Sequence, residues 1–188
     1  MNFQNRFNKK YKDNENTFGL TPLPIVKNAL DYVKRGNALD LGVGNGRNTI
    51  YLLSKSFQVT GVDSSQVGLN ILGERLGSNT QLETVLCDVM KFETNKKYDI
   101  ILAIGLLHFL PQEDSTTLVT KIQGWTNLGG INVLGAKMTQ NAMQDLPHIF
   151  KKNELKKFYD KKGWEIKEYN EIGGNNPTVQ FLIAQKIS

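Results

Sequence analysis

The chain has a single cysteine, Cys87, among its 188 residues. A lone cysteine excludes a disulfide within the chain and provides no cluster of thiols for a metal, so we expect no metal site. No run of about 18 consecutive apolar residues occurs, so we expect no transmembrane helix and no membrane partner. Met1 to Lys12 is polar and basic, without the apolar core of a signal peptide, which favours a cytoplasmic protein.

Neither hydrophobicity nor charge is extreme. Hydrophobic residues make up 39% and charged residues 22% of the chain, which is typical of a globular domain. We predict one domain over residues 1–188, with residues 1–20 as a loosely ordered N-terminal arm. Much of the net charge of +5 lies in the lysine-rich segment 151–162. Because Glu154 and Asp160 interrupt these lysines, we interpret the segment as the solvated face of a helix and expect no nucleic-acid partner.

Apolar strands alternate with helical patterns along the chain. Strands are expected at 38–41, 58–62, 82–87, 98–104, 131–135, 164–169 and 178–187, with Gly129 and Gly130 turning into the fifth. Helices are expected from Thr21-Pro22, from about Arg47, from Ser64 or Ser65 to Gly77, from Asp114 or Ser115 to Trp125, and within the lysine-rich segment. The last two strands have no helix between them and must therefore pair antiparallel. The predicted fold is α/β: Rossmann-like, doubly wound, with a mostly parallel seven-stranded sheet and an antiparallel C-terminal strand.

The segment Ala38–Asn48 is the most informative part of the sequence. An apolar strand containing Asp40 leads into the turn Gly42-x-Gly44-x-Gly46, and a helix follows. Glycines allow a sharp turn and a close approach of the backbone to a ligand. About 20 residues further on, the next strand leads to Asp63, where a carboxylate can accept hydrogen bonds from ribose hydroxyls. This pattern predicts a βαβ unit that binds a nucleoside.

The position of Asp40 argues against a dinucleotide. A pyrophosphate at a helix N-terminus needs N–H groups and positive charge, and a carboxylate beside the turn would repel it. The glycine spacing also differs from the dinucleotide pattern G-x-G-x-x-G. S-adenosylmethionine (SAM) carries an ammonium and a sulfonium but no phosphate. We therefore predict SAM as the cofactor and S-adenosylhomocysteine as its product, with NAD as the weaker alternative.

Three acidic residues follow three successive strands: Asp40, Asp63 and Asp88. The carboxyl ends of the strands are where open α/β sheets bind ligands. A single acid at such a place is often only a helix cap, but three in succession favour a binding site. We expect Asp40 near the methionine ammonium, Asp63 at the ribose and Asp88 at the adenine amino group. The predicted cofactor site also includes Gly42, Gly44, Arg47, Asn48, Ser64, Val89 and Ile104.

Two residues are candidates for work on the methyl acceptor. His108, after the fourth strand, is either a base or substrate-orienting group, or a packed loop residue. Lys137, after the fifth strand, suits an anionic acceptor. His148 is expected at the surface, in a linker over 138–150 that forms a mobile lid together with residues 1–20. Three further residues are interpreted as packing: Cys87, Trp125 and Trp164.

The motifs resemble those of class I SAM-dependent methyltransferases and, more closely, the tellurite-resistance methyltransferases. The resemblance lies, in order, in Phe18–Thr21, Leu39–Asn48, Tyr98–Leu102, Lys152–Leu155, Trp164-Glu165 and Tyr169–Glu171. It covers nearly the whole chain. It implies a SAM-dependent methyltransferase acting on a small molecule, with a chalcogen oxyanion or a thiol as the acceptor class.

The chain departs from that family after Glu171. The family continues with a Glu-Leu-His-Arg motif and a further arginine, whereas this chain has Ile172–Pro177 there and no arginine after Arg75. The resemblance therefore supports SAM binding more strongly than tellurite chemistry. Methyl transfer from a sulfonium depends largely on alignment, and an acceptor that is already a soft nucleophile needs no base.

Two other functions remain open from the sequence. One is a methyltransferase acting on RNA or protein. Enzymes that methylate base amino groups carry an Asp/Asn-Pro-Pro-aromatic motif after the fourth strand, where this chain has Ala103-Ile104-Gly105-Leu106. The other is a SAM-binding protein without catalytic activity. We expect a small-molecule acceptor, and a monomer or homodimer.

Overall fold

The structure is a computed structural model that describes residues 3–139, 145–174 and 178–188. It contains one seven-stranded sheet with the strand order β3-β2-β1-β4-β5-β7-β6. The strands are β1 (Asn37–Leu41), β2 (Gln58–Asp63), β3 (Leu82–Leu86), β4 (Tyr98–Ile104), β5 (Thr126–Lys137), β6 (Trp164–Ile172) and β7 (Val179–Lys186). Strands β1 to β5 pair in parallel, whereas β7 lies antiparallel to both β5 and β6. The predicted fold class is confirmed.

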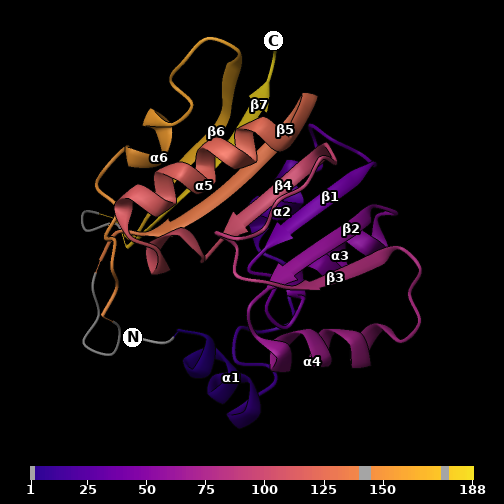
Figure 1. The fold of residues 1–188 in the computed structure, drawn as a ribbon. Helices are drawn as coiled ribbons and strands as arrows, with labels where there is room; N and C mark the ends of the chain where they lie inside the picture. Colours follow the sequence, from indigo (N-terminus) through magenta and orange to yellow (C-terminus); the bar gives the residue numbers. More distant parts are fainter. Residues whose placement is uncertain (1–2, 140–144, 175–177) are drawn as a thin grey trace.

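Helices cover both faces of the sheet (Figure 1). They are α1 (Phe3–Asp13), α2 (Pro24–Ala29), α3 (Arg47–Ser54), α4 (Gln66–Leu76), the 3-10 turn η1 (Leu107–Phe109), α5 (Gln112–Trp125) and α6 (Glu154–Lys157). One buried cluster joins α2 and α3 to the sheet through Val26 and Leu52, and the opposite cluster joins α5 through Leu118 and Ile122. The predicted doubly wound arrangement follows from these two apolar faces.

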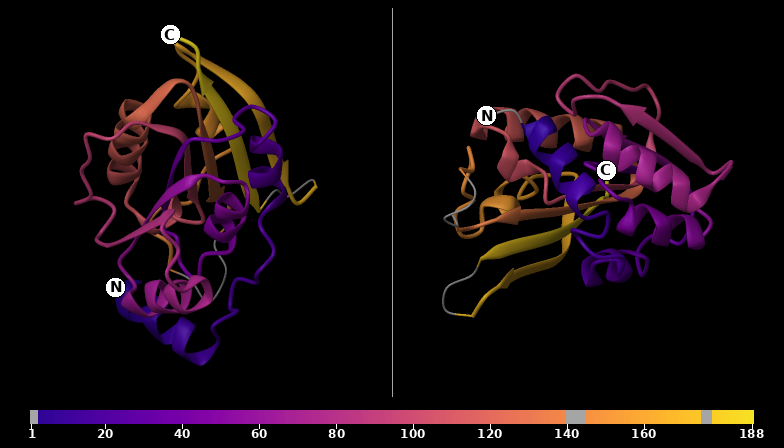
Figure 2. Two further views of the ribbon diagram at one scale, coloured as in Figure 1. Left: turned by 90° about the vertical axis from the view of Figure 1, so that its right-hand side faces the viewer. Right: turned by 90° about the horizontal axis from the view of Figure 1, so that it is seen from below.

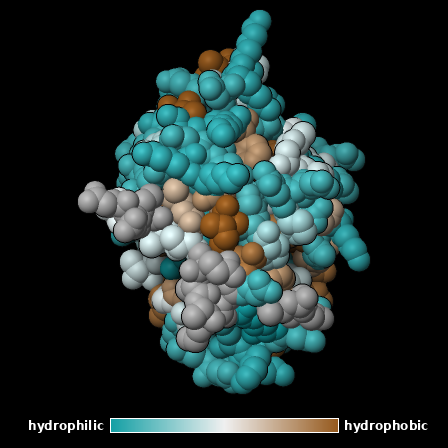
Figure 3. Space-filling view, turned by 90° about the vertical axis from the view of Figure 1, so that its left-hand side faces the viewer, coloured by the Kyte–Doolittle hydropathy of each residue, from teal (hydrophilic) through white to brown (hydrophobic). Residues whose placement is uncertain are grey.

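Strand β4 lies at the centre of the sheet. Ile100 to Ala103 are fully buried, which explains the continuous apolar run in the sequence. The carboxyl ends of β1, β2, β4 and β5 meet at one edge, and α1 lies beneath that edge (Figures 1 and 2). On the face shown in Figure 3, hydrophobic side chains gather in the middle, with polar surface above and below. None of the helices within the described ranges has the length and apolar character needed to cross a membrane.

The prediction of a loosely ordered arm over residues 1–20 is wrong for most of its length. Phe3–Asp13 forms α1, which packs against α4. Its inner face carries Phe3, Phe7 and Tyr11 at a spacing of four residues, and Tyr11 is buried. The helix is otherwise strongly polar, so only its contacts with the rest of the domain reveal that this spacing is a packed face.

Two predicted helix starts are also wrong. Helix α2 begins at Pro24, which is the proline at its first position, and not at Thr21-Pro22. Helix α5 begins at Gln112 after Pro111, so neither Asp114 nor Ser115 is its cap. By contrast, the Ser65 cap of α4 is confirmed, because its Oγ accepts a hydrogen bond from Gly68 N at 3.1 Å.

Strand β5 is longer than predicted and begins at Thr126. Gly129 and Gly130 therefore lie inside the strand, where its ladder with β4 shifts register between Tyr98 and Ile100. The lysine-rich helix is shorter than predicted, since α6 covers only Glu154–Lys157. Trp125 belongs to the buried core, whereas Trp164 is partly buried beside Tyr159.

Candidate functional site

A cavity of about 1120 Å³ opens at the carboxyl edge of the sheet. Sites for a single small ligand usually measure roughly 300–1,000 Å³, so this cavity has room for a cofactor and an acceptor together. All of the site residues predicted from the sequence line it: Asp40, Gly42, Gly44, Arg47, Asn48, Asp63, Ser64, Asp88, Val89, Ile104, His108 and Lys137. The individual roles predicted for them stay predictions.

The glycine turn forms one wall of this cavity. Gly42, Gly44 and Gly46 all have positive φ angles, of 74°, 56° and 87°. Side chains with a Cβ rarely adopt this conformation, which is why the turn needs glycine. Gly42 N donates to Val62 O at 2.8 Å, so the turn is attached to β2. A Cβ at Gly44 would overlap the Tyr11 hydroxyl, so a larger residue there would force the Tyr11 side chain to move.

Asp63 is held by the backbone on both sides. Its Oδ2 accepts from Gly44 N at 2.8 Å and its Oδ1 accepts from Ser65 N at 2.7 Å. Burial raises the pKa of this carboxyl, and the hydrogen bonds from backbone N–H groups oppose that rise. Each carboxylate oxygen can accept a second hydrogen bond. The carboxylate is therefore preorganised to accept further donors from a ligand in the cavity.

Asp40 is the most deeply buried of the three acids, with 4% of its surface exposed. Its Oδ2 accepts a hydrogen bond from Thr49 Oγ1 at 2.7 Å. Burial, together with the nearby charge of Asp63, raises the pKa of Asp40 to about 7, although the Thr49 hydrogen bond opposes the rise. A cation bound in the cavity would favour the ionised form, which is what an ammonium partner requires.

Asp88 lies two residues beyond β3 and is exposed. Its Oδ1 accepts from Met90 N at 3.0 Å, which fixes the turn after the strand. Val89, in contrast, is buried next to it and provides an apolar surface in the cavity wall. This pair suits a flat heterocycle with an exocyclic amino group, as predicted for adenine.

A segment that follows α1 covers the glycine turn; it lies within residues 1–20, predicted as part of a lid, but its attachment through Arg75 was not predicted from the sequence. Arg75 Nη1 donates to Asn45 O at 2.8 Å, and its Nη2 donates to Asn16 Oδ1 at 2.8 Å. Arg47 Nη1 donates to Phe18 O at 2.7 Å. These bonds attach residues 15–18 to the turn, and so Arg47 serves the cover as well as the cavity wall. The Phe18–Thr21 motif was the available signal.

Helix α1 is fixed to the same side of the cavity. Gln4 Nε2 donates to Ser64 O at 2.8 Å, and Ser65 Oγ donates to Asn8 Oδ1 at 2.7 Å. Both contacts fall at the start of α4, directly after the predicted ribose-binding strand end. The N-terminal helix is therefore a wall of the candidate site and not a separate arm.

Aromatic rings from three segments line the cavity next to α1. The ring centroids of Phe3 and Phe7 lie 5.2 and 5.1 Å from that of Phe109 in η1. Phe18 lies 6.3 Å from Phe7, and Lys10 Nζ lies 5.6 Å from the centre of the Phe18 ring. The four-residue spacing in α1 was the sequence signal for this wall, but it does not identify the partner ring.

His108 is buried in the cavity wall, with 3% of its surface exposed. Lys137 N approaches its Nδ1 at 3.4 Å. Burial, assisted by the charges of Lys137 and His148, lowers the pKa of His108 to about 3. A neutral imidazole of such low basicity is a weak proton acceptor, so this environment favours an orienting role over a general base.

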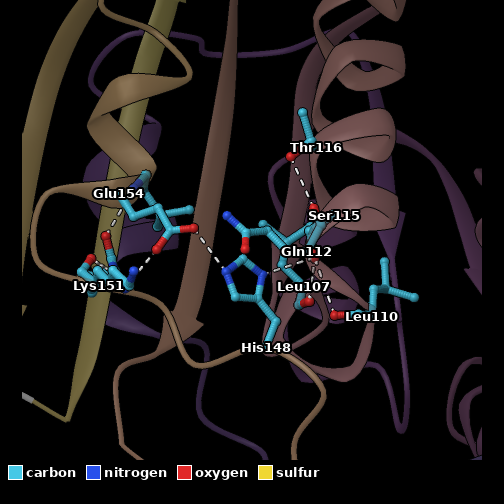
Figure 4. A network of polar contacts seen from close by, with 10 residues as sticks. Leu107, Leu110, Gln112, Ser115, Thr116, His148, Lys151 and Glu154 are labelled. Carbon is cyan, nitrogen blue, oxygen red and sulfur yellow. Dashed lines mark hydrogen bonds and ion pairs between the residues drawn. The ribbon is translucent and has the colours of Figure 1, made fainter.

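The prediction that His148 lies at the surface is wrong, since only 6% of it is exposed. Its Nε2 lies 2.8 Å from Glu154 Oε1, and its Nδ1 lies 3.4 Å from Ser115 Oγ (Figure 4). Its ring stacks on Phe150 with the centroids 3.9 Å apart. The sequence signal that was missed for a buried His148 is Glu154, which belongs to the motif Lys152–Leu155 of the family resemblance.

This arrangement contains a serine, a histidine and a glutamate but is a structural brace. Ser115 is fully buried, and its Oγ donates to Leu107 O at 2.8 Å (Figure 4). A hydroxyl used in this way is neither accessible nor free to attack a substrate. The brace links residues 148–154 to η1, which carries His108. Residues 140–144 of the predicted lid lie outside the described residues.

Two other motifs of the resemblance meet in space. Asn153 N donates to Tyr169 Oη at 3.0 Å and to Glu171 Oε1 at 2.9 Å. Lys156 Nζ also lies 5.3 Å from the centre of the Tyr169 ring. These contacts hold α6 against β6, so the motifs 152–155 and 169–171 have a structural role. Among the described residues, no group of three or more His, Cys, Asp or Glu is placed to hold a metal ion.

Comparisons with known proteins show which proteins this chain is similar to. The family model described as "Tellurite resistance protein TehB" matches residues 2–178. The "Probable S-adenosyl-L-methionine-dependent methyltransferase TehB" of Haemophilus influenzae (strain 10810) is 34% identical over 153 residues, which cover 79% of this chain and 53% of that protein. The chain thus spans about half the length of the curated relatives it matches first.

Solved structures show the same fold. The crystal structure of TehB from Haemophilus influenzae superposes with a TM-score of 0.76 at 27% identity, covering 97% of this chain and 66% of that chain. The N-methyltransferase NodS from Bradyrhizobium japonicum WM9, solved with S-adenosyl-L-homocysteine, superposes with a TM-score of 0.82 over all of both chains. Its identity of 14% limits that likeness to the fold.

Proposed function

The chain belongs to the tellurite resistance protein TehB family, and from this premise we propose that it is a SAM-dependent methyltransferase that acts on a small-molecule acceptor. The predicted family, fold class and cofactor class agree with that membership. One observation carries the proposal. The glycine turn and three carboxylates, near the end of β1, at the end of β2 and just beyond β3, line one cavity with room for two ligands.

The residues present fit the cofactor. Asp63 is held by two backbone N–H groups while each of its oxygens can still accept a hydroxyl. Asp40 is a buried acid whose ionised form needs a cation nearby, as an amino-acid ammonium would provide. Gly42 and Gly44 leave the turn without side chains on the cavity side. These features support binding of the ribose by Asp63, of the ammonium by Asp40 and of the adenine by Asp88 and Val89.

SAM supplies a methyl group that is already activated by its sulfonium. The task of the protein is then to align the acceptor and to exclude water. His108 and Lys137 also line the cavity and are the candidates for orienting the acceptor. Because His108 is a weak base, the site favours an acceptor that is already an anion or a soft nucleophile, such as a thiolate or a chalcogen oxyanion.

The cover over the glycine turn supports a small acceptor. Arg47 and Arg75 hold residues 15–18 against the turn, and α1 is attached to the start of α4. A macromolecular acceptor would have to reach the cavity past these segments. A small molecule enters without displacing them.

Two measurements test the proposal. Isothermal titration with SAM, S-adenosylhomocysteine and NAD should show binding of the first two in the micromolar range and none of the third. A methyl-transfer screen with labelled SAM over thiols, chalcogen oxyanions and small amines should then yield a methylated small molecule. Binding of NAD without SAM would overturn the cofactor assignment, whereas SAM binding with no transfer to any acceptor class would favour a non-catalytic binding protein.

A further inference from the structure

The residues that line the cavity fall into two sets of different chemistry. One set is the carboxylates at the ends of β1 and β2 and beyond β3, and it is assigned above to the cofactor. The other set, called here the second half of the lining, is the rings and basic side chains from α1, η1 and the end of β5. The following inference concerns this second half and rests on the proposed methyltransferase function.

The second half is largely aromatic. Phe7 stands perpendicular to Phe109, at an interplanar angle of 90°, and Phe3 meets the same ring at 61°. Leu106 and Leu110 continue this lining from either side of η1. Phenyl and leucyl side chains offer no hydrogen bonds to a small oxyanion, so an acceptor without an apolar body would gain nothing from this part of the lining. They favour a ligand with a flat apolar body that can pack against the rings.

Positive charge lies within the same half. Lys10 comes from α1 and Lys137 from the end of β5, and both side chains are half-buried in the cavity wall. Burial and the charges of Arg6 and Lys137 together lower the pKa of Lys10. Two cations close enough to affect one another make this wall attractive to an anionic group. A ligand that consists only of an apolar ring would gain nothing from these two positive charges.

We infer that the acceptor is a small aromatic anion, specifically an aryl thiolate bearing a second anionic group, whose ring packs on the Phe3–Phe7–Phe109 wall and whose anionic group lies near Lys10 and Lys137. In the reaction the thiolate sulfur forms a bond to the methyl carbon. The bond from that carbon to the sulfonium breaks, and its electron pair stays on the sulfur of S-adenosylhomocysteine. The acceptor is already ionised, so no proton has to be removed.

The test compares methyl acceptors that carry an aromatic ring, an anionic group, or both. With saturating SAM, we measure kcat/KM for 4-mercaptobenzoate, 4-methylbenzenethiol, 2-mercaptoacetate and tellurite. 4-Mercaptobenzoate has both features and is expected to exceed 2-mercaptoacetate and tellurite by at least about 10-fold. 4-Methylbenzenethiol, which lacks the carboxylate, should fall between them. Faster turnover of tellurite or 2-mercaptoacetate than of either aryl thiol would overturn the inference.

Variants of Lys10 and Phe7 test the two proposed contacts of the acceptor, one with its anionic group and one with its ring. Lys10→Gln should raise KM for 4-mercaptobenzoate about 5-fold or more, with a smaller effect on 4-methylbenzenethiol. The matched control Lys9→Gln changes an exposed lysine on the same helix, paired with Asp13 at 2.8 Å, and should leave both values unchanged. Phe7→Leu should weaken both aryl thiols and spare 2-mercaptoacetate. Equal losses for all acceptors in Phe7→Leu would contradict a ring-packing role.

A binding measurement keeps the inference testable if a variant fails to fold. The product analogue 4-(methylthio)benzoate should bind the unaltered protein saturated with S-adenosylhomocysteine, and acetate should not. Failure of S-adenosylhomocysteine to bind in the same titration would refute the proposed function itself. Bound S-adenosylhomocysteine with no affinity for the aryl product would refute only the acceptor class.

Discussion

Replacing Asp63 by asparagine separates the ligand-binding role of this carboxylate from its role in the fold. The two oxygens of Asp63 accept from Gly44 N at 2.8 Å and Ser65 N at 2.7 Å. An asparagine of the same size keeps one acceptor oxygen and presents an amide NH₂ to the other donor. The charge that would accept both ribose hydroxyls is lost.

The expected loss of affinity can be worked from these contacts. A hydrogen bond to a charged group contributes about 1.5–3 kcal/mol when its partner is otherwise left unsatisfied. Retaining one neutral acceptor limits the loss to about one such bond, which corresponds to a roughly 10- to 150-fold rise in Kd for S-adenosylhomocysteine. Protein stability should also fall, by about 1–2 kcal/mol, because one backbone N–H group loses its acceptor, while removal of a buried charge offsets part of that cost.

The assay is isothermal titration with S-adenosylhomocysteine, accompanied by urea unfolding of the same samples. Asp31→Asn is the matched control, because Asp31 is an exposed carboxylate, 81% accessible, in a surface pair with Lys34. Its Kd should equal that of the unaltered protein. A Kd for Asp63→Asn within two-fold of the unaltered protein, in a sample whose urea unfolding shows that it is folded, would refute the ribose assignment.

Four further predictions follow from the site. Asp40→Asn should stabilise the protein at pH 8 by about 1–3 kcal/mol in urea unfolding, because a folded-state pKa of about 7 makes the carboxyl increasingly costly as the pH rises from about 4 through 7. It should weaken binding of S-adenosylhomocysteine, and in the unaltered protein that binding should weaken as the pH falls from 7.5 to 6. His148→Ala should destabilise the fold by about 2–3 kcal/mol, since it leaves buried partners unpaired. His108→Ala should change kcat less than 10-fold for an anionic acceptor, whereas Lys137→Ala should raise KM in a salt-sensitive manner. Hydrogen exchange in residues 3–20 should slow when S-adenosylhomocysteine and acceptor bind.

For each of these four predictions, a specific result would contradict it. Equal stability of Asp40→Asn and the unaltered protein at pH 8 would show that Asp40 carries no buried charge there. An unfolding curve for His148→Ala that matches the parent would contradict the brace. A loss of 100-fold or more in kcat for His108→Ala, with a pH profile that flattens near 6.5, would identify a general base. Unchanged exchange in residues 3–20 would argue against closure over the ligand.

The succession of strands along the chain and the sheet edge that carries the candidate site were accessible from the sequence for a local reason. Short segments of the sequence determine where each strand ends, where the glycine turn lies and where the acids near the strand ends stand. Parallel strands then bring their carboxyl ends to one edge of the sheet. The missing helix between the last two strands likewise determined that they pair antiparallel. Asp40, Asp63 and Asp88 could therefore be placed together before any tertiary contact was known.

The environment of individual side chains depends on partners far away in the chain. His148 was expected at the surface, but Ser115 and Glu154 enclose it from two different helices. The low basicity of His108 comes from burial and from neighbouring charges, including that of Lys137 on another strand. Neither effect can be predicted from the residues next to these histidines in the sequence.

The sequence by itself determined the fold class, the family and the edge of the sheet that carries the candidate site, because periodicity and turn chemistry are local. Only the tertiary structure decided that residues 3–13 form a helix against α4, and that its rings meet Phe109 across the cavity. A short polar helix gains its stability from the surface on which it packs. For that reason the residues proposed for the cofactor could be predicted from the sequence, whereas the ring-lined wall proposed for the acceptor emerged only from long-range packing.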